Sequence, residues 1–233
     1  MNLLIDKSYW DSEWIKIFDH YQNDPRFAHY LYAVLEDNER RVLELGAGSF
    51  RDMEKLNKWG LECYGVDFSD KSIEEAQKRF PEYNERIIQS NAFKLPFSDK
   101  YFDVSYHNGF WSCFSDNDIV LLASEQARVT KKRMIVAVHN AHNPAFVEYF
   151  NKLKVDNPLY SARFFSLSEV TFLMDACCYD IEIIPVGKGK KHYEDYLINL
   201  GLGSRDNLRK CFEYHKMNLL ETSERLLCIG KIK

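Results

Sequence analysis

Two glycines and one acidic residue have the types and the spacing that can hold a nucleoside. An apolar run from Val42 to Leu45 ends in Gly46-Ala47-Gly48, and Asp67 closes the next apolar run. Glycines directly after a buried strand let the chain turn sharply and let its backbone approach a ligand without a Cβ atom in the way. A carboxylate at the tip of the neighbouring strand can accept hydrogen bonds from both hydroxyls of a ribose. This pattern predicts a cofactor that contains a nucleoside.

The rest of the loop argues against a dinucleotide. The dinucleotide fingerprint is Gly-x-Gly-x-x-Gly, and its third glycine lies where the pyrophosphate meets a helix N-terminus. Gly48 supplies the second glycine, but Arg51 stands at the third position, although Asp67 follows Gly46 by 21 residues, close to the usual spacing. The chain also has no Gly-x-x-x-x-Gly-Lys-Ser/Thr loop for a nucleoside triphosphate. A cofactor with a ribose and no pyrophosphate fits better, and S-adenosyl-L-methionine is the common one.

Five motifs, in order and at the expected spacing, resemble those of the class I S-adenosylmethionine-dependent methyltransferases of the small-molecule type. They are Glu44-Leu45-Gly46-Ala47-Gly48, Val66-Asp67-Phe68-Ser69, Asn91-Ala92-Phe93-x-Leu95-Pro96-Phe97, Tyr101-Phe102-Asp103-Val104 followed by His107-Asn108-Gly109, and Glu125-x-x-Arg128-Val129 with the run from Met134 to Val138. The resemblance covers roughly residues 38–186. It implies an enzyme that uses S-adenosyl-L-methionine.

The resemblance also implies which residues bind the cofactor. Glu44 would contact the methionine amino group or its bridging water, unless it forms an ion pair with Arg41 or Arg51 instead. Arg51 could take the methionine carboxylate with help from the helix dipole, and Phe68 would lie against the adenine. The full expected set is Glu44, Gly46, Ala47, Gly48, Arg51, Asp67, Phe68, Asn91, Ala92, Phe93, His107 and Asn108.

Two positions depart from the family pattern. Asn91 replaces the usual acid of the adenine loop, but an amide oxygen can still accept a hydrogen bond from adenine N6. Phe50 stands where many relatives carry another glycine. We expect this change to stiffen the loop more than it blocks the cofactor.

Composition narrows the class of protein and of partner. The formal net charge is −4 with a pI near 6.0, which argues against a nucleic-acid-binding face. The six cysteines are scattered without a C-x-x-C pair, so we expect reduced thiols in a cytoplasmic protein. We find no signal-peptide pattern and no apolar stretch of about 20 residues that would span a membrane. We therefore expect a small-molecule acceptor, no nucleic acid and no membrane, whereas the sequence gives no indication of oligomeric state.

The alternation of elements predicts an α/β fold. We expect strands near 41–45, 61–66, 86–89, 102–106, 133–138, 180–185 and 225–231, with helices between them that start at Ser69 or Asp70, at Asp116 and at the capping box of Ser166 and Glu169. Such alternation is typical of a parallel sheet covered on both faces. With the resemblance, the expected fold is a Rossmann-like, seven-stranded, mostly parallel sheet whose last strand is antiparallel.

Two segments fall outside this core. Residues 1–38 are expected to form two helices broken near Asn23-Asp24-Pro25, and residues 187–224 to form an insertion that is partly helical from Asn207 to Leu220. We interpret both as lid elements around a core of residues 39–186 and a final strand in 225–233. The aromatic residues of the first segment, Trp14 and Phe18 among them, could equally bury a face against the sheet.

Histidines at strand ends are the candidates for acid–base chemistry. Methyl transfer from a sulfonium needs mainly alignment of the acceptor, and an oxygen acceptor usually also needs a base. His139 follows the fifth strand and is the candidate base or acceptor-orienting residue. Alternatively, it hydrogen-bonds the local backbone at the strand end. His107, His139 and His142 lie too far apart in strand position to predict a metal, so none is expected.

Substrate contacts are expected from the first lid and from one arginine. Tyr9 and Trp10 are the candidates in the first lid. Arg163 lies among aromatic residues, and together with the run from Lys188 to His192 it could grip an anionic acceptor. The lysines of that run are more typical of a solvated turn.

Three functions remain open at this point: a methyltransferase for O or N of a small polar or anionic metabolite or sugar, a nucleic-acid or protein methyltransferase, and a non-catalytic module that binds the cofactor. His107-Asn108-Gly109-Phe110 stands where nucleic-acid amino-methylating enzymes carry Asn/Asp-Pro-Pro-Phe/Tyr. Cys113 lacks the context of a carbon-5 pyrimidine nucleophile. The first function is therefore favoured.

Overall fold

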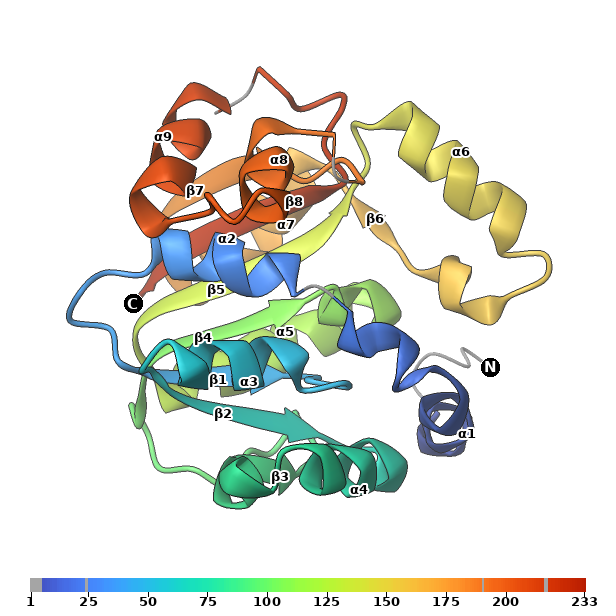
Figure 1. The fold of residues 1–233 in the computed structure, drawn as a ribbon, viewed down its shortest axis with the longest axis vertical. Coiled ribbons are helices and arrows are strands. Elements are labelled where there is room, and N and C mark those ends of the chain that lie inside the picture. Colours follow the sequence, from blue (N-terminus) through green and yellow to red (C-terminus); the bar gives the residue numbers. More distant parts are fainter. Residues whose placement is uncertain (1–5, 24, 190, 216–217) are drawn as a thin grey trace.

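One sheet forms the centre of the molecule (Figure 1). The computed structural model describes residues 6–23, 25–189, 191–215 and 218–233. The strand order is β3-β2-β1-β4-β5-β8-β7. The strands are β1 (Arg41–Leu45), β2 (Glu62–Asp67), β3 (Ile87–Gln89), β4 (Phe102–Asn108), β5 (Thr130–Asn140), β7 (Cys178–Val186) and β8 (Arg225–Ile232).

The strand directions agree with the prediction of a mostly parallel sheet with an antiparallel last strand. Strands β1 to β5 pair in parallel, while β8 runs antiparallel between β5 and β7. The order reverses between β1 and β4, which in open α/β sheets leaves a ligand-binding crevice at the carboxyl ends of the strands. An eighth strand, β6 (Phe164–Phe165), pairs with the end of β5. At two residues it is too short to produce a periodic signal in the sequence.

The connecting helices begin where their side-chain caps predict. The side chain of Ser69 accepts a hydrogen bond at the start of α4 (Asp70–Arg79), and that of Ser115 does so before α5 (Asp116–Val129). Ser166 and Glu169 form a complete capping box at α7 (Leu167–Asp175). Helix α3 (Arg51–Lys58) follows the glycine loop, and η3 (Pro81–Arg86) and η4 (Phe110–Cys113) are short turns of 3₁₀ helix.

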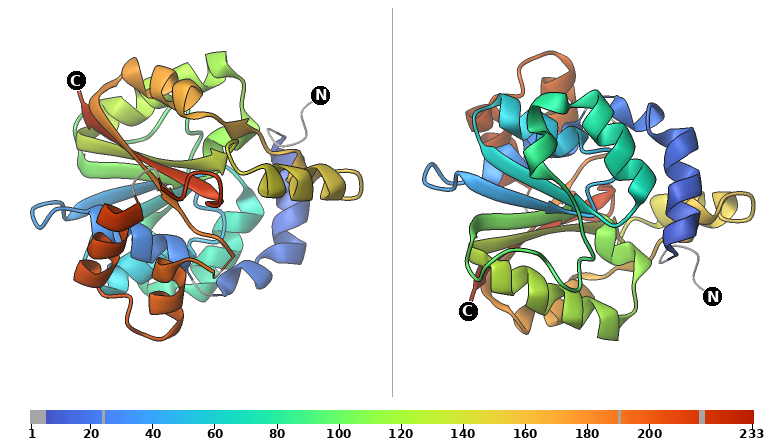
Figure 2. Two further views of the ribbon diagram at one scale, coloured as in Figure 1. Left: turned by 90° about the horizontal axis from the view of Figure 1, so that it is seen from above. Right: turned by 90° about the horizontal axis from the view of Figure 1, so that it is seen from below.

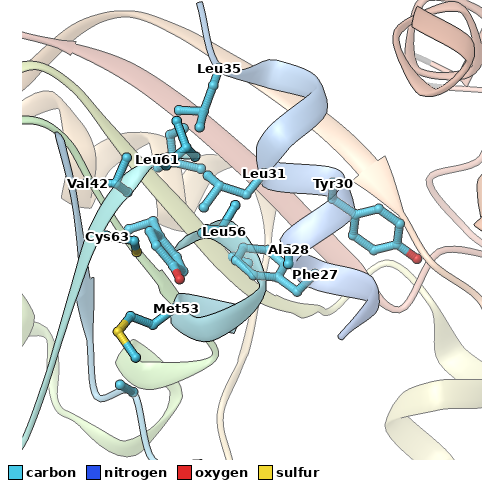
Figure 3. Close-up of a cluster of buried hydrophobic side chains, with 14 of the residues drawn as sticks. Phe27, Ala28, Tyr30, Leu31, Leu35, Val42, Met53, Leu56, Leu61 and Cys63 are labelled. Carbon is cyan, nitrogen blue, oxygen red and sulfur yellow. The ribbon is translucent and has the colours of Figure 1, made fainter. Parts of the chain in front are cut away.

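Helices cover both faces of the sheet (Figure 2). Helices α2 (Arg26–Val34), α3, α4, α8 (Tyr193–Asn199) and α9 (Arg205–His215) bury their apolar side chains on one face, and α5 and α7 on the other. Figure 3 shows part of the first core, where Phe27 and Leu31 of α2 meet Leu56 of α3 and Cys63 of β2. Each fully buried side chain of this size contributes roughly 1.5–3 kcal/mol. The rigid core fixes the strand ends that form the site.

Two helical segments lie at the carboxyl edge of the sheet (Figure 1). The first contains α1 (Lys7–Ile17) and η2 (His20–Gln22), and the predicted break before α2 is present, with Asp24 outside the described residues. The second contains α6 (Pro144–Leu153) and η5 (Pro158–Ser161), between β5 and β6. The sequence pattern does not predict this second segment.

The segment 187–224 lies elsewhere than predicted. Its helices α8 and α9 pack on α2 and on one face of the sheet, and the cavity described below has no lining residue from this segment among the residues that the structure describes. It therefore covers the sheet instead of acting as a lid, because its apolar residues Ile198, Leu208 and Phe212 join the core. The predicted helix from Asn207 to Leu220 is observed up to His215, and positions 216–217 lie outside the described residues.

Two further expectations concern the surroundings of the protein. Throughout the described ranges, no helix combines the length and apolarity needed to cross a bilayer. All six cysteines are free thiols, and three of them, Cys63, Cys178 and Cys228, are buried. A cytoplasmic location remains a prediction.

Candidate functional site

A cavity of about 1030 Å³ opens at the carboxyl ends of β1, β2, β4 and β5. This volume is at the upper end of the range for small-molecule sites, so it has room for a cofactor and a small acceptor together. Most of the residues predicted from the sequence contribute to its lining. They are Trp10, Glu44, Gly46, Ala47, Gly48, Arg51, Asp67, Phe68, Asn91, Ala92, Phe93, Asn108 and His139.

The glycine loop follows β1 and has a left-handed backbone at both glycines. Gly46 has φ +59° and Gly48 has φ +55°, a region that L side chains rarely adopt. A Cβ atom at Gly46 would lie 2.5 Å from a ring carbon of Phe110, and one at Gly48 would overlap the indole of Trp14. Both glycines are thus required by backbone conformation and by close packing.

Phe50 ends the loop and enters α3 with φ +56°. Its ring is fully buried and lies where a Cβ atom at Gly65 of β2 would be, 2.6 Å from the ring. The side chain therefore points into the core and away from the cavity, so the departure at this position leaves the loop open to a ligand.

Asp67, at the end of β2, faces the glycine loop. Its Oδ2 accepts a hydrogen bond from the Gly48 N–H at 2.9 Å, and its Oδ1 accepts one from the Ser69 N–H at 2.9 Å. Burial raises the pKa of the Asp67 carboxyl to about 6, although these N–H donors favour the charged form. Each carboxylate oxygen keeps acceptor capacity for a ligand.

Glu44 is buried in β1, and its Oε2 accepts a hydrogen bond from the Met53 N–H at 3.1 Å. Burial, together with the nearby carboxylate of Asp52, raises the pKa of Glu44 well above its usual range. The alternative of an ion pair with Arg41 is not observed, since Arg41 pairs with Glu62 at 3.0 Å. The cavity therefore contains a buried carboxyl group that favours a cationic ligand.

Arg51 joins the glycine loop to the N-terminal segment. Its Nη1 donates to the Tyr21 carbonyl at 2.8 Å and to the Asn23 side-chain oxygen at 2.9 Å. Nearby, the Gln22 side chain donates to the Ser49 carbonyl at 3.0 Å. The N-terminal segment is thus fastened to the rim of the cavity.

The loop after β3 forms another wall. The Phe93 N–H donates to the Asn91 side-chain oxygen at 3.0 Å, which leaves that oxygen one further lone pair. The ring of Phe93 is 38% exposed and stands edge-on to the ring of Phe114. With Phe68, this wall offers apolar surface and one amide.

His139, the last but one residue of β5, lines the same cavity. Its Nδ1 lies 2.8 Å from the Oγ atom of Ser112, and its ring packs against Phe146, Phe150 and Phe164. Burial, followed by the charge of Arg225, lowers the pKa of His139 well below its usual range, so the ring is neutral at neutral pH. If Nδ1 donates to Ser112, Nε2 keeps a lone pair that can accept a proton.

Comparison with known proteins identifies the family. Residues 43–138 match a family model described as a methyltransferase domain. Residues 43–138 of this chain therefore form a methyltransferase domain, as the class I resemblance implied. The resemblance drawn from the motifs is thereby confirmed.

Individual relatives match only part of this chain or share only its fold. The chain is 31% identical over 137 residues to the uncharacterized methyltransferase YcgJ of Bacillus subtilis, which spans 56% of this chain and 53% of that protein. It is 34% identical over 106 residues to demethylmenaquinone methyltransferase of Thermotoga maritima, and this alignment covers 44% of this chain and 45% of that protein. The chain thus spans about half the length of the curated relatives it matches.

A solved structure shows the same fold over nearly the whole chain. It is that of a methyltransferase from Thermotoga maritima, described as S-adenosylmethionine-dependent and as a possible histamine N-methyltransferase. The TM-score is 0.63 at 20% identity, with 95% of each chain covered.

His107 and Tyr9 were predicted to line the site, but neither contributes to the lining of the cavity. His107 is fully buried under Phe110 and Trp111, neither ring nitrogen has a hydrogen-bond partner among the described residues, and burial lowers its pKa to about 3. The expected role on the cofactor wall is corrected accordingly: the alternation of β4 turns His107 into the core, while the next residue, Asn108, lines the cavity. Tyr9 packs edge-on against Trp10 and is also absent from the lining.

Arg163 also does not contribute to the lining of the cavity. Its guanidinium pairs with Asp116 and with Glu169, the latter at 3.0 Å, and stacks over the Phe165 ring. Its charge is therefore used within the fold, which corrects the predicted grip on an acceptor. In the lysine run, the Lys188 N–H donates to Asp195, and position 190 lies outside the described residues.

His107, His139 and His142, the three histidines considered for a metal site, have different surroundings and share no bonding partner among the described residues. His142 Nε2 accepts a hydrogen bond from the Leu167 N–H at the start of α7, His139 bonds the Ser112 side chain, and the ring of His107 has no hydrogen-bond partner among the described residues. The described ranges contain no cluster of three or more His, Cys, Asp or Glu that could hold a metal ion.

Several lining residues escaped the sequence reasoning. Phe150, Leu159 and Tyr160 come from the segment of α6 and η5, and Arg225 is the first residue of β8. A signal for Arg225 existed, because an antiparallel last strand beside β5 must start at the carboxyl edge. The α6 segment gave none, since its place depends on tertiary packing.

Proposed function

We propose that this chain is an S-adenosylmethionine-dependent methyltransferase that acts on an oxygen or nitrogen atom of a small polar molecule, with no nucleic-acid or membrane partner. One observation carries the proposal: the glycine loop, two buried carboxyl groups and a neutral histidine share a single cavity. Because the chain spans about half of its curated relatives, activity and acceptor are proposals for this protein.

The residues present fit the cofactor. The oxygens of Asp67 keep acceptor capacity for both ribose hydroxyls. Glu44 forms no ion pair with an arginine or lysine in the described part of the chain, and a cationic amino group would supply the counter-charge that this buried carboxyl lacks. The remaining amide acceptor of Asn91 suits the adenine amino group. These contacts support S-adenosylmethionine over a dinucleotide.

When bound, S-adenosylmethionine supplies a methyl group on a sulfonium, whose carbon–sulfur bond breaks with the electron pair left on sulfur. The protein has to align the acceptor and exclude water. The N-terminal segment and the α6 segment flank the cavity and limit solvent access. His139 Nε2 accepts the proton that an acceptor O–H or N–H loses as its bond to the methyl carbon forms.

The acceptor is expected to be small. The net charge of −4 does not favour nucleic acid, and the cavity has volume for one compact molecule beside the cofactor. The names of related proteins refer to demethylmenaquinone and to possible histamine methylation. They support methyl transfer without agreeing on an acceptor.

The test is calorimetric titration with S-adenosylmethionine, S-adenosylhomocysteine and NAD. We expect both sulfur compounds to bind and NAD not to bind. In Asp67→Ala the affinity should fall by roughly 1.5–3 kcal/mol, the value of hydrogen bonds to a charged acceptor. Asp99→Ala is the matched control, because Asp99 is a surface carboxylate 75% exposed and outside the lining.

Binding of NAD, or no binding of either sulfur compound, would overturn the proposed function. A protein that binds both but releases no S-adenosylhomocysteine with any acceptor in a metabolite extract would instead be a cofactor-binding module. The two experiments together therefore separate the enzyme from the non-catalytic alternative.

A further inference from the structure

Arg225 places a guanidinium in the cavity, beside the candidate base. It is the first residue of β8, and in the antiparallel ladder it stands opposite His139, the residue near the end of β5. Both residues line the cavity, and the charge of Arg225 acts on His139. Strand β8 thus places the Arg225 guanidinium in the same part of the cavity in which β5 places His139.

The guanidinium of Arg225 has no ion-pair partner in the described part of the chain, although the charge of the adjacent Glu224, which lies 4.0 Å from Arg26, acts on it. Over the described ranges, no carboxylate lies within ion-pair distance of its guanidinium, and its Nη1 is buried with no hydrogen-bond partner. The other lysine and arginine of the lining are engaged: Lys7 pairs with Asp70 at 2.6 Å, and Arg51 donates to Tyr21 and Asn23. Even the neighbouring Arg26 pairs with Asp195 at 3.3 Å.

A buried cation without a counter-ion is costly, so native proteins normally pair it or use it. Burial lowers the pKa of Arg225 to about 10, which still leaves the group charged at neutral pH. A ligand anion would satisfy both the charge and the planar array of N–H donors. Arg225 is the one lysine or arginine of the lining whose side chain has neither an ion pair nor a hydrogen bond among the described residues. Its site therefore matches a single negative charge, as in a carboxylate.

The walls beside this charge are aromatic. Phe150 packs edge-on to the His139 ring at 5.0 Å between ring centres, and Tyr160 packs edge-on to Phe150 at 5.1 Å. Both line the cavity, and Trp10 and Tyr21 line it from the N-terminal segment. Rings of this kind suit a flat apolar body, because aromatic pairs favour edge-to-face and offset contacts.

We propose that Arg225 binds the carboxylate of the methyl acceptor, and that the acceptor is a small aromatic carboxylic acid. This inference rests on the proposed function, because it names the acceptor class of the same site. With its carboxylate on Arg225 and its ring against the cavity faces of Phe150 and Tyr160, the acceptor lies next to His139. Arg225 thus takes the acceptor-binding role predicted for Arg163, whose guanidinium already pairs with Asp116 and Glu169.

The test is calorimetric titration with benzoate and with its neutral counterpart benzamide, in protein saturated with S-adenosylhomocysteine. We expect benzoate to bind the wild type, and to bind Arg225→Gln more weakly by about tenfold or more, as for loss of charge-assisted hydrogen bonds. Benzamide should bind both proteins weakly and equally. Arg163→Gln is the matched control, because it removes an arginine near the same edge that is already paired, and it should leave benzoate affinity unchanged.

Arg225→Lys keeps the charge and loses the planar fork, so its benzoate affinity should lie between those of the wild type and Arg225→Gln. This second variant also serves if Arg225→Gln does not fold. Equal benzoate binding by the wild type and these variants, equal binding of benzoate and benzamide, or no benzoate binding would overturn the proposal.

The outcome for S-adenosylhomocysteine separates this inference from the proposed function. If the variants weaken S-adenosylhomocysteine and leave benzoate unchanged, Arg225 holds the cofactor's carboxylate and the proposal is wrong. If the wild type binds no S-adenosylhomocysteine, the proposed function fails, and benzoate titrated alone still decides whether Arg225 is an anion site.

Discussion

The indole ring of Trp14 fills the space that a side chain at Gly48 would need, so helix α1 rests directly on the glycine loop. Trp14 also stacks on Trp10 at 5.8 Å between ring centres and contacts Tyr21 edge-on. Asp11 of the same helix accepts a hydrogen bond from the Ser69 hydroxyl at 2.7 Å. The position of α1 and the shape of the cofactor loop are therefore coupled.

We expect Gly48→Ala to lose cofactor affinity as well as stability. A left-handed backbone at a residue with a Cβ atom costs about 1–3 kcal/mol of the free energy of unfolding, and the methyl group must also displace Trp14. Urea denaturation and titration with S-adenosylhomocysteine measure the two effects. Gly60→Ala is the matched control, because Gly60 has φ +85° and open space around its α-carbon. Equal stability losses in both variants, with cofactor affinity unchanged, would show that the Trp14 contact does not matter.

Acid should weaken cofactor binding through Asp67. Its pKa is raised to about 6 by burial, and only the carboxylate accepts from both ribose hydroxyls. Affinity for S-adenosylhomocysteine should therefore fall by about tenfold between pH 7 and pH 5, as the ionised fraction falls. Titrations at these two pH values check it.

The same shift acts on the unliganded protein with the opposite sign. Because the folded-state pKa of Asp67 lies above the unfolded value of 3.8, this group favours folding below pH 3.8, and that contribution is lost as pH rises towards 6. Asp67→Asn cannot ionise at this position, so its cofactor affinity should be low and should change less between pH 5 and pH 7 than that of the wild type. A wild-type affinity that is flat from pH 5 to 7 would contradict the role of Asp67.

Removing the charge of Arg225 should raise the pKa of His139. Burial is the larger cause of the lowered pKa, and the neighbouring guanidinium adds to it by disfavouring the imidazolium. In Arg225→Gln the ring should titrate at higher pH than in the wild type. An NMR titration of the His139 Cε1–H signal, assigned with His139→Gln, measures this without an acceptor. Identical titration in both proteins would mean that the two groups are not coupled.

The sequence was sufficient for the parts of the fold that local chemistry determines. The seven main strands, the cap at Ser69, the helix start at Asp116 and the capping box at Ser166 follow from periodicity and hydrogen-bonding side chains within a few residues. Gly46 and Asp67 were found for the same reason: a backbone turn and a strand-end carboxylate are local features.

The remainder depends on contacts between distant residues. Arg163 seemed free in the sequence because its partner Asp116 is 47 positions away. His107 and Asn108 are neighbours in β4, and only their opposite orientations place Asn108 on the cavity and His107 in the core. The position of Arg225 beside His139 depends on the pairing of β8 with β5. Such relationships are fixed by tertiary packing, which periodicity does not encode.

Glu194, in the first turn of α8, should be important for stability although it lies outside the cavity lining. It is fully buried, accepts from the Gly187 N–H at 2.9 Å, and bonds His215 Nε2 at 2.5 Å and His192 Nδ1 at 3.3 Å. Glu194→Ala would leave these groups unpaired in the interior, which costs about 3–5 kcal/mol. Urea denaturation at neutral pH measures it. Glu148→Ala is the control, because Glu148 forms a surface pair with Lys152 and should contribute no more than about 1 kcal/mol.

The same cluster predicts part of the acid sensitivity. Burial alone would raise the pKa of Glu194, but the bonds from His192, His215 and Gly187 lower it to about 2. Its stabilisation is therefore complete above the unfolded pKa of 4.5 and is lost as pH falls towards 2, a change of about 3 kcal/mol. Wild type and Glu148→Ala should lose stability steeply in this window, whereas Glu194→Ala, already weakened, should lose less. Parallel curves for all three proteins would show that Glu194 does not carry the effect.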